Sequence, residues 1–210
     1  RTTANLPCTN RSMFILMRPA FYLTCNLCSP YKRNQLGDSQ MRANKRDELL
    51  QKALSVFYQN GFNATGMDLL VKETGISKTS MYKHFKTKDD LILATLRLRD
   101  ELFRNTILRR MEELSDTPKG QVLALFDAMG EWFVSEEFRG CMFIKASSEF
   151  QDPSHAIRRQ SAEHKLLFAE HIQRLLVEAG YSATDVLTRQ LMVLKEGAII
   201  AAHVSQSTTA

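Results

Sequence analysis

The stretch TGMDLLVKETGISKTSMYKHFKTK, which runs from Thr65 to Lys88, decides the fold of this chain. Gly75 stands near its centre, between two short segments with helical apolar spacing. Glycine permits the left-handed backbone that reverses a chain tightly between two helices. We therefore predict a helix over 66–74 and a second helix over 77–85, joined by a turn at Gly75.

Side chains suited to helix capping stand at the predicted boundaries. Thr65, followed by Asp68, is expected to cap the first helix, and Ser77 the second. Thr87, followed three residues later by Asp90, forms the pattern of a capping box. A longer helix is therefore predicted to begin at residue 88.

The second helix of this pair is predicted to bind DNA. Its nine residues span roughly 13 Å, so its N-terminal end fits a major groove about 12 Å wide. Lys78 can donate to guanine, while Thr79 and Ser80 offer hydroxyls to base edges. Tyr82 and His84 lie further along and are expected to contact phosphates, as is Lys88 at a helix N-terminus.

The motifs Gly75-Ile76-Ser77-Lys78, Met81-Tyr82-Lys83-His84-Phe85 and Lys88-Asp89-Asp90-Leu91 resemble the DNA-binding domain of the TetR family, over residues 43–103. This resemblance implies that Lys78, Thr79 and Ser80 read bases. It implies that the DNA backbone is held by Thr65, Gly66, Met67, Tyr82, His84 and Lys88.

Four positions depart from the family pattern. Val71 and Thr74 stand where small residues are usual and predict altered packing between the two helices. Gly66 stands where a residue with a hydroxyl group is common in the family, which weakens one expected phosphate contact. Thr79 stands where glycine or another small residue is frequent, and this difference is expected to affect which operator sequence is recognised.

The rest of the chain has helical apolar spacing and no convincing strand, so an all-α fold of about nine helices is expected. Residues 1–42 are interpreted as a poorly ordered N-terminal extension. Residues 43–103 are the predicted DNA-binding domain, with its motif at about 66–85. Residues 104–210 are the predicted regulatory and dimerisation domain.

The charge distribution favours DNA binding by the front of the chain. Residues 41–90 carry nine basic against six acidic side chains, a balance of +3, whereas residues 91–210 carry fourteen against sixteen, a balance of −2. A basic front half suits contact with a polyanion.

The resemblance also implies a homodimer through two long helices, about 154–179 and 184–205, and a pocket for an unknown small-molecule inducer. Apolar residues such as Phe168 and Ile172 on the first helix and Leu187 and Leu191 on the second are assigned to the dimer. Aromatic residues and methionines make an adaptable apolar pocket. Its candidate lining residues are Phe103, Ile107, Met111, Phe126, Met129, Trp132, Phe133, Met142 and Phe168.

No catalytic motif, cofactor site or metal site is expected. Cys25 and Cys28 have zinc-like or redox-like spacing, but no second pair completes four ligands. Apolar residues 13–28 are split by Arg18 and Pro19 into runs too short to cross a bilayer. We therefore expect a cytoplasmic protein with operator DNA as its partner and no membrane partner.

Two functions remain open on the sequence. The first is a repressor that an inducer releases from a palindromic operator. The second is a DNA-binding regulator without such an inducer, either an activator or a corepressor-dependent protein.

Overall fold

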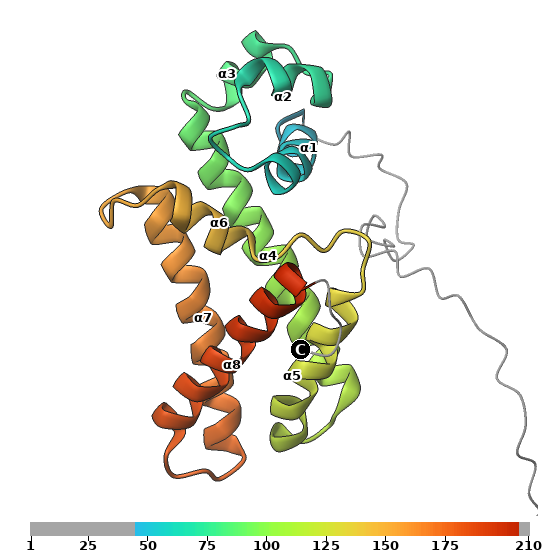
Figure 1. Ribbon diagram of the computed structural model, residues 1–210, viewed down its shortest axis with the longest axis vertical. Coiled ribbons are helices and arrows are strands. Elements are labelled where there is room, and N and C mark those ends of the chain that lie inside the picture. The colour runs from blue at the N-terminus through green and yellow to red at the C-terminus, as the bar shows by residue number, and fades with distance from the viewer. Residues whose placement is uncertain (1–44, 206–210) are drawn as a thin grey trace, which may run out of the picture. The chain divides into compact units, whose positions relative to one another are not determined.

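The computed structural model describes residues 45–205, in which the chain forms eight α-helices and no strand (Figure 1). The all-α prediction is confirmed, with eight helices in this range where about nine were expected. They are α1 (Lys45–Asn60), α2 (Met67–Thr74), α3 (Lys78–His84), α4 (Lys88–Leu114), α5 (Pro118–Phe133), α6 (Met142–Glu149), α7 (Ala156–Glu178) and α8 (Thr184–Ser205).

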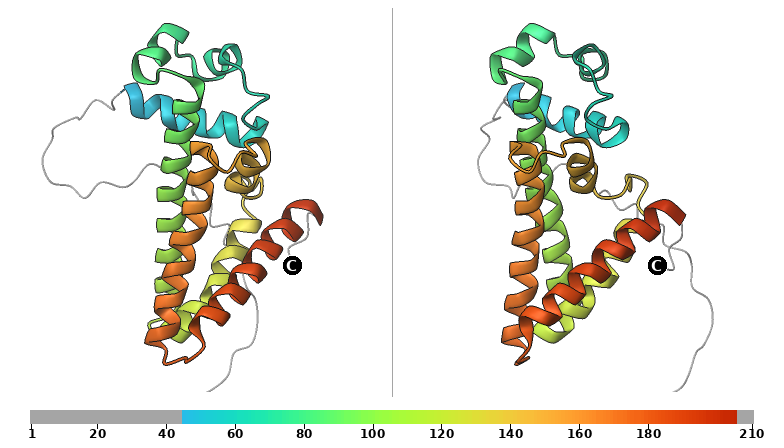
Figure 2. Two further views of the ribbon diagram at one scale, coloured as in Figure 1. Left: turned by 90° about the vertical axis from the view of Figure 1, so that its left-hand side faces the viewer. Right: turned by 60° about the vertical axis from the view of Figure 1, so that its left-hand side comes forward.

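A first apolar core holds α1, α2 and α3 around the first turns of α4, as Figure 2 shows. Phe57 of α1, Leu70 of α2, Met81 of α3 and Ile92 of α4 are almost completely buried in it. The start of α6 also belongs to this core through Met142. The first three helices therefore share their core with α4 and α6.

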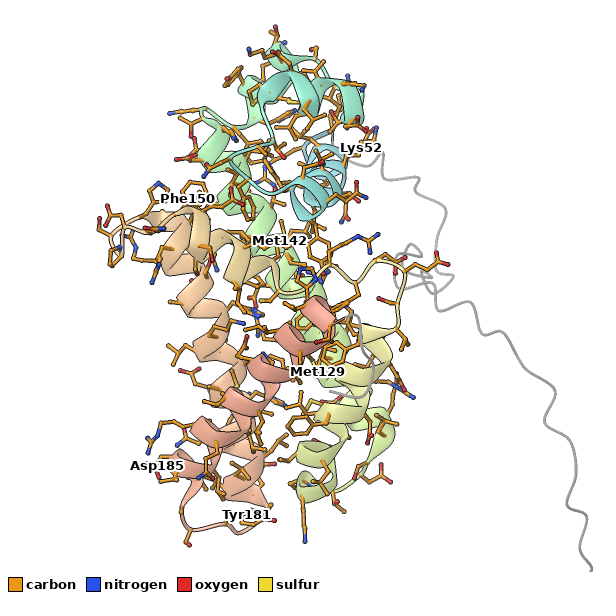
Figure 3. The ribbon with its side chains drawn as sticks, viewed as in Figure 1. Lys52, Met129, Met142, Phe150, Tyr181 and Asp185 are labelled. Carbon is orange, nitrogen blue, oxygen red and sulfur yellow. The ribbon has the colours of Figure 1, made fainter. Side chains whose placement is uncertain are left out.

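A second core lies between the later part of α4 and helices α5, α7 and α8. Met111, Leu125, Phe168 and Ile172 are completely buried there. Figure 3 places Met129 among these helices and Met142 at the start of α6. Phe168 and Ile172, which the sequence analysis assigned to the dimer interface, instead pack inside the protomer.

Helix α4 belongs to both cores, through Leu91 and Leu96 near its start and Phe103 and Ile107 further along. The predicted domain boundary at residue 103 therefore falls within a continuous helix. The boundary stays a prediction, and α4 gives the two cores a shared rigid element.

The caps of α3 and α4 are those predicted. The Ser80 backbone N–H donates to the Ser77 hydroxyl at 3.3 Å. Thr87 and Asp90 form the complete capping box, with both side chain to backbone distances at 3.0 Å. Because each cap fixes where a helix begins, the first residue of α3 and that of α4 follow from local sequence.

The predicted cap of α2 is wrong. Gly66 occupies the N-cap position without a side-chain hydrogen bond, and α2 begins at Met67. The Thr65 side chain is fully buried, and its hydroxyl donates to the Gly61 carbonyl at 2.6 Å. The hydroxyl therefore closes the turn after α1, and no side-chain hydrogen bond caps α2.

Several predictions lie outside the described residues: the N-terminal extension, Cys25 and Cys28. Within residues 45–205, no helix is both long enough and apolar enough to span a membrane.

Candidate nucleic-acid interface and the neighbouring cavity

The turn between α2 and α3 is held by backbone and hydroxyl hydrogen bonds. Gly75 adopts a φ of +69°, and its N–H donates to the Val71 carbonyl at 3.0 Å. The buried Thr74 hydroxyl donates to the Leu70 carbonyl at 2.6 Å and accepts from the Ile76 N–H at 3.2 Å. Thr74 therefore fits this turn, although a small residue was expected there.

A lysine of α1 fixes this pair of helices to the rest of the first core. The Lys52 Nζ, labelled in Figure 3, donates to the Thr74 carbonyl at 2.8 Å. This hydrogen bond ties the last turn of α2 to α1. It is favourable because the partial negative charge at a helix C-terminus attracts a cation. The orientation of α3 is therefore set by α1 as well as by the turn.

Helix α3 buries one face and exposes the other. Met81 is buried within the helix, and Phe85 directly after it. The side chains of Lys78, Thr79, Tyr82 and His84 are exposed and that of Ser80 is half-buried. The Lys78 Nζ lies 3.9 Å from the exposed Asp68 carboxylate, a distance at which the pair is weak. The predicted base-reading and phosphate-binding side chains of α3 are thus accessible together.

Cations continue from α3 into the start of α4. Lys88 is half-buried as the first residue of α4, where free backbone amides favour an anion. Lys83 and Lys86 are exposed beside the predicted set. Sequence reasoning omitted both, although they alternate with Tyr82, His84 and Phe85 in the motif itself.

The start of α2 can present backbone amides to DNA, but few accessible side chains. Gly66 is exposed, and Met67 packs against the first core. Thr65, which was expected to contact the DNA backbone, has no accessible side chain. Any phosphate contact at this helix start therefore falls to the amides after Gly66.

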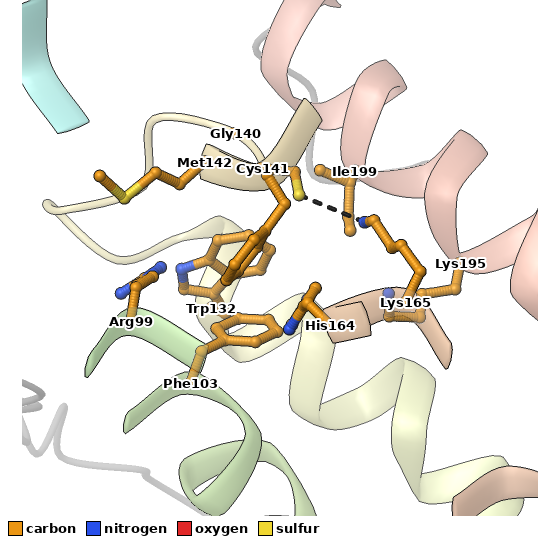
Figure 4. Close-up of a pocket in the computed structure, with 11 residues that line it drawn as sticks. Arg99, Phe103, Trp132, Gly140, Cys141, Met142, His164, Lys165, Lys195 and Ile199 are labelled. Atoms are coloured by element: carbon orange, nitrogen blue, oxygen red, sulfur yellow. Dashed lines mark hydrogen bonds between the residues drawn. The ribbon is translucent and has the colours of Figure 1, made fainter. Parts of the chain in front are cut away.

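A cavity of about 10 Å³, roughly one water molecule's worth of space, lies where the two cores meet (Figure 4). Helices α4, α5, α6, α7 and α8 and the loop before α6 contribute to its wall. It is lined by Arg99, Phe103, Trp132, Gly140, Cys141, Met142, Phe143, His164, Lys165, Lys195 and Ile199.

A buried hydrogen bond between His164 and Asp100 supports one wall of the cavity. The His164 Nδ1 lies 2.7 Å from the Asp100 carboxylate, which also accepts from Arg104 at 2.9 and 3.2 Å. Burial by itself raises the pKa of Asp100, but the hydrogen bonds from His164 and Arg104 outweigh it and bring the pKa to about 2. Because Asp100 is then ionised at neutral pH, the His164 Nδ1 carries the proton and donates it.

Burial lowers the pKa of His164, and the hydrogen bond to Asp100 offsets this only in part. The ring is therefore neutral near pH 7. It stacks on Phe143, with ring centroids 3.7 Å apart and an interplanar angle of 9°. His164 is thus part of an aromatic wall with a fixed tautomer.

The same wall is bonded to the C-terminal end of α1. The Tyr58 hydroxyl donates to the Gly140 carbonyl at 2.7 Å and accepts from the Arg139 N–H at 3.0 Å. Further along α6, the Glu149 carboxylate accepts from the Phe62 N–H at 3.0 and 3.1 Å. Gly140 of the cavity wall is therefore bonded directly to α1, and the end of α6 is bonded to the turn that follows α1.

A comparison with solved structures decides the family. A crystal structure of a TetR-family transcriptional regulator from Streptomyces coelicolor superposes with a TM-score of 0.70 at 33% sequence identity, covering 74% of this chain and 77% of that one. The family described as "Bacterial regulatory proteins, tetR family" matches residues 49–95. The chain belongs to the TetR family. It is a DNA-binding transcriptional regulator and not an enzyme.

The sequence similarity between this TetR-family chain and its curated relatives extends beyond the helix-turn-helix. The HTH-type transcriptional activator FasR of Mycolicibacterium smegmatis is 28% identical over 130 residues, which cover 60% of this chain and 57% of FasR. The HTH-type transcriptional regulator LmrA of Bacillus subtilis is 24% identical over 167 residues, covering 78% of this chain and 89% of LmrA.

The predicted pocket residues of this TetR-family protein divide into two groups. Phe103, Trp132 and Met142 line the cavity. The others pack in the second core, either buried or partly buried: Ile107, Met111, Phe126, Met129, Phe133 and Phe168. Sequence reasoning missed the charged members, Arg99, Lys165 and Lys195, because charged side chains are normally solvent-exposed. The apolar residues one helical turn before and after Lys195, Leu191 and Ile199, were the one available signal.

Lys78 provides a test of base reading. We expect Lys78→Ala to lose about 1–3 kcal/mol of discrimination at one base pair per half-site, because a lysine donating to guanine reads that position. The measurement compares affinities for operator duplexes that differ by one substituted base pair. An equal loss of affinity for every duplex would instead assign Lys78 to the phosphates.

Proposed function

We propose that this chain is a repressor that binds a palindromic operator as a homodimer and is released by a small-molecule inducer. The observation that carries the proposal is the hydrogen-bonded link between Tyr58 of α1 and Gly140 of the cavity wall, together with the adjacent Arg139. A molecule that enlarges the cavity displaces this wall and with it the helices that present α3. Such a regulator acts on chromosomal DNA, which places it in the cytoplasm.

In this proposal the exposed end of α3 enters the major groove. Lys78, Thr79 and Ser80 read base edges, and Tyr82, His84 and Lys88 hold phosphates. At the start of α2, Gly66 and Met67 contribute backbone amides. Lys83 and Lys86 add positive charge beside these contacts.

The dimer forms through exposed apolar residues of α7 and α8. On α8, Val186, Val193 and Ile200 follow one another at seven-residue intervals, close to two helical turns, so they share a face. All three are well exposed in the protomer, as are Leu166 and Val177 on α7. A surface of this kind is typical of a protein interface. This face replaces the Phe168 and Ile172 stripe as the proposed contact.

Two-fold symmetry supplies the mechanism of release. The two α3 helices of a dimer must lie about 34–36 Å apart, one DNA turn, to read both half-sites together. An inducer that binds better to a dimer with another spacing shifts the population away from DNA by its difference in affinity. The inducer thereby acts without any chemical reaction.

A regulator that is not released by an inducer is the second candidate. The small volume of the cavity favours it, because a ligand can enter only after side chains have moved. The curated relative FasR is named an activator, so the sign of regulation is also open within the family.

The experiment is a reporter gene driven by the promoter of the chain's own transcription unit. A repressor gives higher expression when its gene is deleted, and an activator gives lower expression. With purified protein, a compound that restores expression should also abolish the band shift of this promoter. Retention of the shifted complex with every compound that restores expression would contradict release by an inducer.

Tyr58→Phe tests the proposed link in the same assay. It removes only the hydroxyl that joins α1 to the cavity wall, and it leaves α3 and its cations unchanged. We expect promoter affinity to be retained and the response to inducer to weaken.

A further inference from the structure

The cavity contains more positive than negative charge. The Glu196 carboxylate lies 2.6 Å from the Lys165 Nζ and 2.6 Å from the Lys195 Nζ. One carboxylate thus serves two ammonium groups. A buried cation is costly unless it is paired, so the second ammonium lacks a full counter-charge.

Lys195 is the most constrained of these cations. Its side chain is fully buried, and its Nζ lies 4.6 Å from the centre of the Phe168 ring. Burial, and then repulsion by Lys165, lower the pKa of Lys195. Burial by itself raises the pKa of Glu196, but the two lysines outweigh it and the net pKa is lowered. A further anion beside Lys165 and Lys195 would reduce the repulsion between these two ammonium groups.

Arg99 adds a third cation on another side of the cavity, as Figure 4 shows. Within residues 45–205, Arg99 forms no ion pair with a carboxylate, and its guanidinium instead lies 4.9 Å from the Tyr58 ring centre and 5.2 Å from that of Phe103. Asp100, the neighbouring acid, is already engaged by Arg104 and His164. The cavity therefore has no spare carboxylate to neutralise Arg99.

Flat apolar surfaces face these cations. The rings of Phe103 and Trp132 meet edge to face with centroids 4.7 Å apart. Phe143, stacked on His164, forms another part of the wall. Aromatic surfaces of this kind favour a planar apolar group in offset or edge contact.

We propose that the cavity binds a small aromatic carboxylate, with the carboxylate held by Lys165 and Lys195 and the ring held by Phe103 and Trp132. This inference rests on the proposed function, since it names the chemical class of the inducer. A charge-assisted hydrogen bond from an ammonium gives the carboxylate its advantage over a neutral group of the same shape.

The ligand enters from a groove between α6 and α7. This groove has a volume of about 720 Å³, and it shares Phe143 and Lys165 with the cavity. Rotation of Phe143 away from His164 joins the two spaces. Because Phe143 lies directly after Met142 in the first core, this movement is transmitted toward α1.

The test uses the fluorescence of Trp132, the single tryptophan of the chain, which lines the cavity. The probes are benzoate and cyclohexanecarboxylate, each paired with its neutral amide, titrated into the full-length protein without DNA. We expect saturable quenching or a spectral shift with both acids, stronger with benzoate. Each amide should bind at least about tenfold more weakly, as the loss of one charge-assisted hydrogen bond implies.

Two variants at the lysine pair should change benzoate affinity in opposite directions. Lys195→Met removes a cation while keeping the length of the side chain, so benzoate binds about tenfold more weakly. Glu196→Gln removes the competing carboxylate, so benzoate binds more tightly. Lys119→Met, at an exposed lysine in the first turn of α5 away from the cavity, is the matched control and should change nothing.

Equal binding of benzoate and benzamide would overturn the proposed anion. Weaker binding in both Lys195→Met and Glu196→Gln would show a merely structural role for the pair and would overturn it too, as would the absence of any saturable signal. The operator assay without these probes decides the proposed function separately. Release by an uncharged compound would leave that function standing while this inference fails.

Discussion

Val193→Asp is expected to convert the dimer into a monomer and to lower operator affinity by about 100-fold or more, because each protomer would bury an unpaired carboxylate. Val193 is 72% exposed in the protomer and lies midway along the proposed face of α8. By two-fold symmetry, one substitution places two charges in one apolar interface. A monomer presents a single α3 to the DNA, so it loses the second half-site.

Sedimentation equilibrium gives the molecular mass of the variant, and a band shift gives its operator affinity. Val134→Asp is the matched control, since Val134 is 65% exposed but follows α5, outside α7 and α8. The control should remain dimeric with unchanged affinity. A dimeric Val193→Asp protein with normal affinity would place the interface elsewhere.

The second large effect is expected from Tyr82→Ala combined with Lys88→Ala. Tyr82 is 43% exposed on α3 and Lys88 opens α4, so both can reach phosphates flanking the bases. Removing both should weaken binding to all sequences by about 10–100-fold at low salt. Loss of the Lys88 charge should also flatten the salt dependence by roughly one unit of slope, whereas the neutral Tyr82 hydroxyl contributes to affinity alone.

The measurement is the operator affinity over a range of salt concentrations, for the cognate duplex and for a scrambled one. Lys119→Ala removes the same charge away from the proposed interface and serves as the control. An unchanged salt slope in the double variant would remove Lys88 from the phosphate contacts, and an unchanged affinity would remove Tyr82 as well.

The DNA-binding helices were predictable because their signals are local. A capping hydroxyl at Ser77 or Thr87 bonds an amide three residues away, and Gly75 adopts its left-handed backbone without help from distant residues. The exposed face of α3 follows from the burial of Met81 and Phe85 at helical spacing. The prediction failed at Thr65 because a polar side chain can bond a carbonyl inside the fold as readily as an amide of the following helix.

The cavity and the proposed dimer face were less predictable, because the burial of the residues involved depends on contacts between distant parts of the chain. Phe168 and Ile172 form an apolar stripe that suits either the protomer core or a dimer, and periodicity alone does not separate the two. The ion pair between Lys165 of α7 and Glu196 of α8 depends on how these two helices pack, and so does the burial of Lys195, which pairs with the adjacent Glu196.

By itself, the amino-acid sequence determined the all-α class, the resemblance of the helix-turn-helix to the TetR family and the face of α3 that meets solvent. Each rests on residues within a few turns of one another. Only the tertiary structure decided that charged residues line the cavity and that Tyr58 bonds to its wall. Those contacts link residues that are distant in sequence, and their energies depend on burial, which spacing along the chain does not specify.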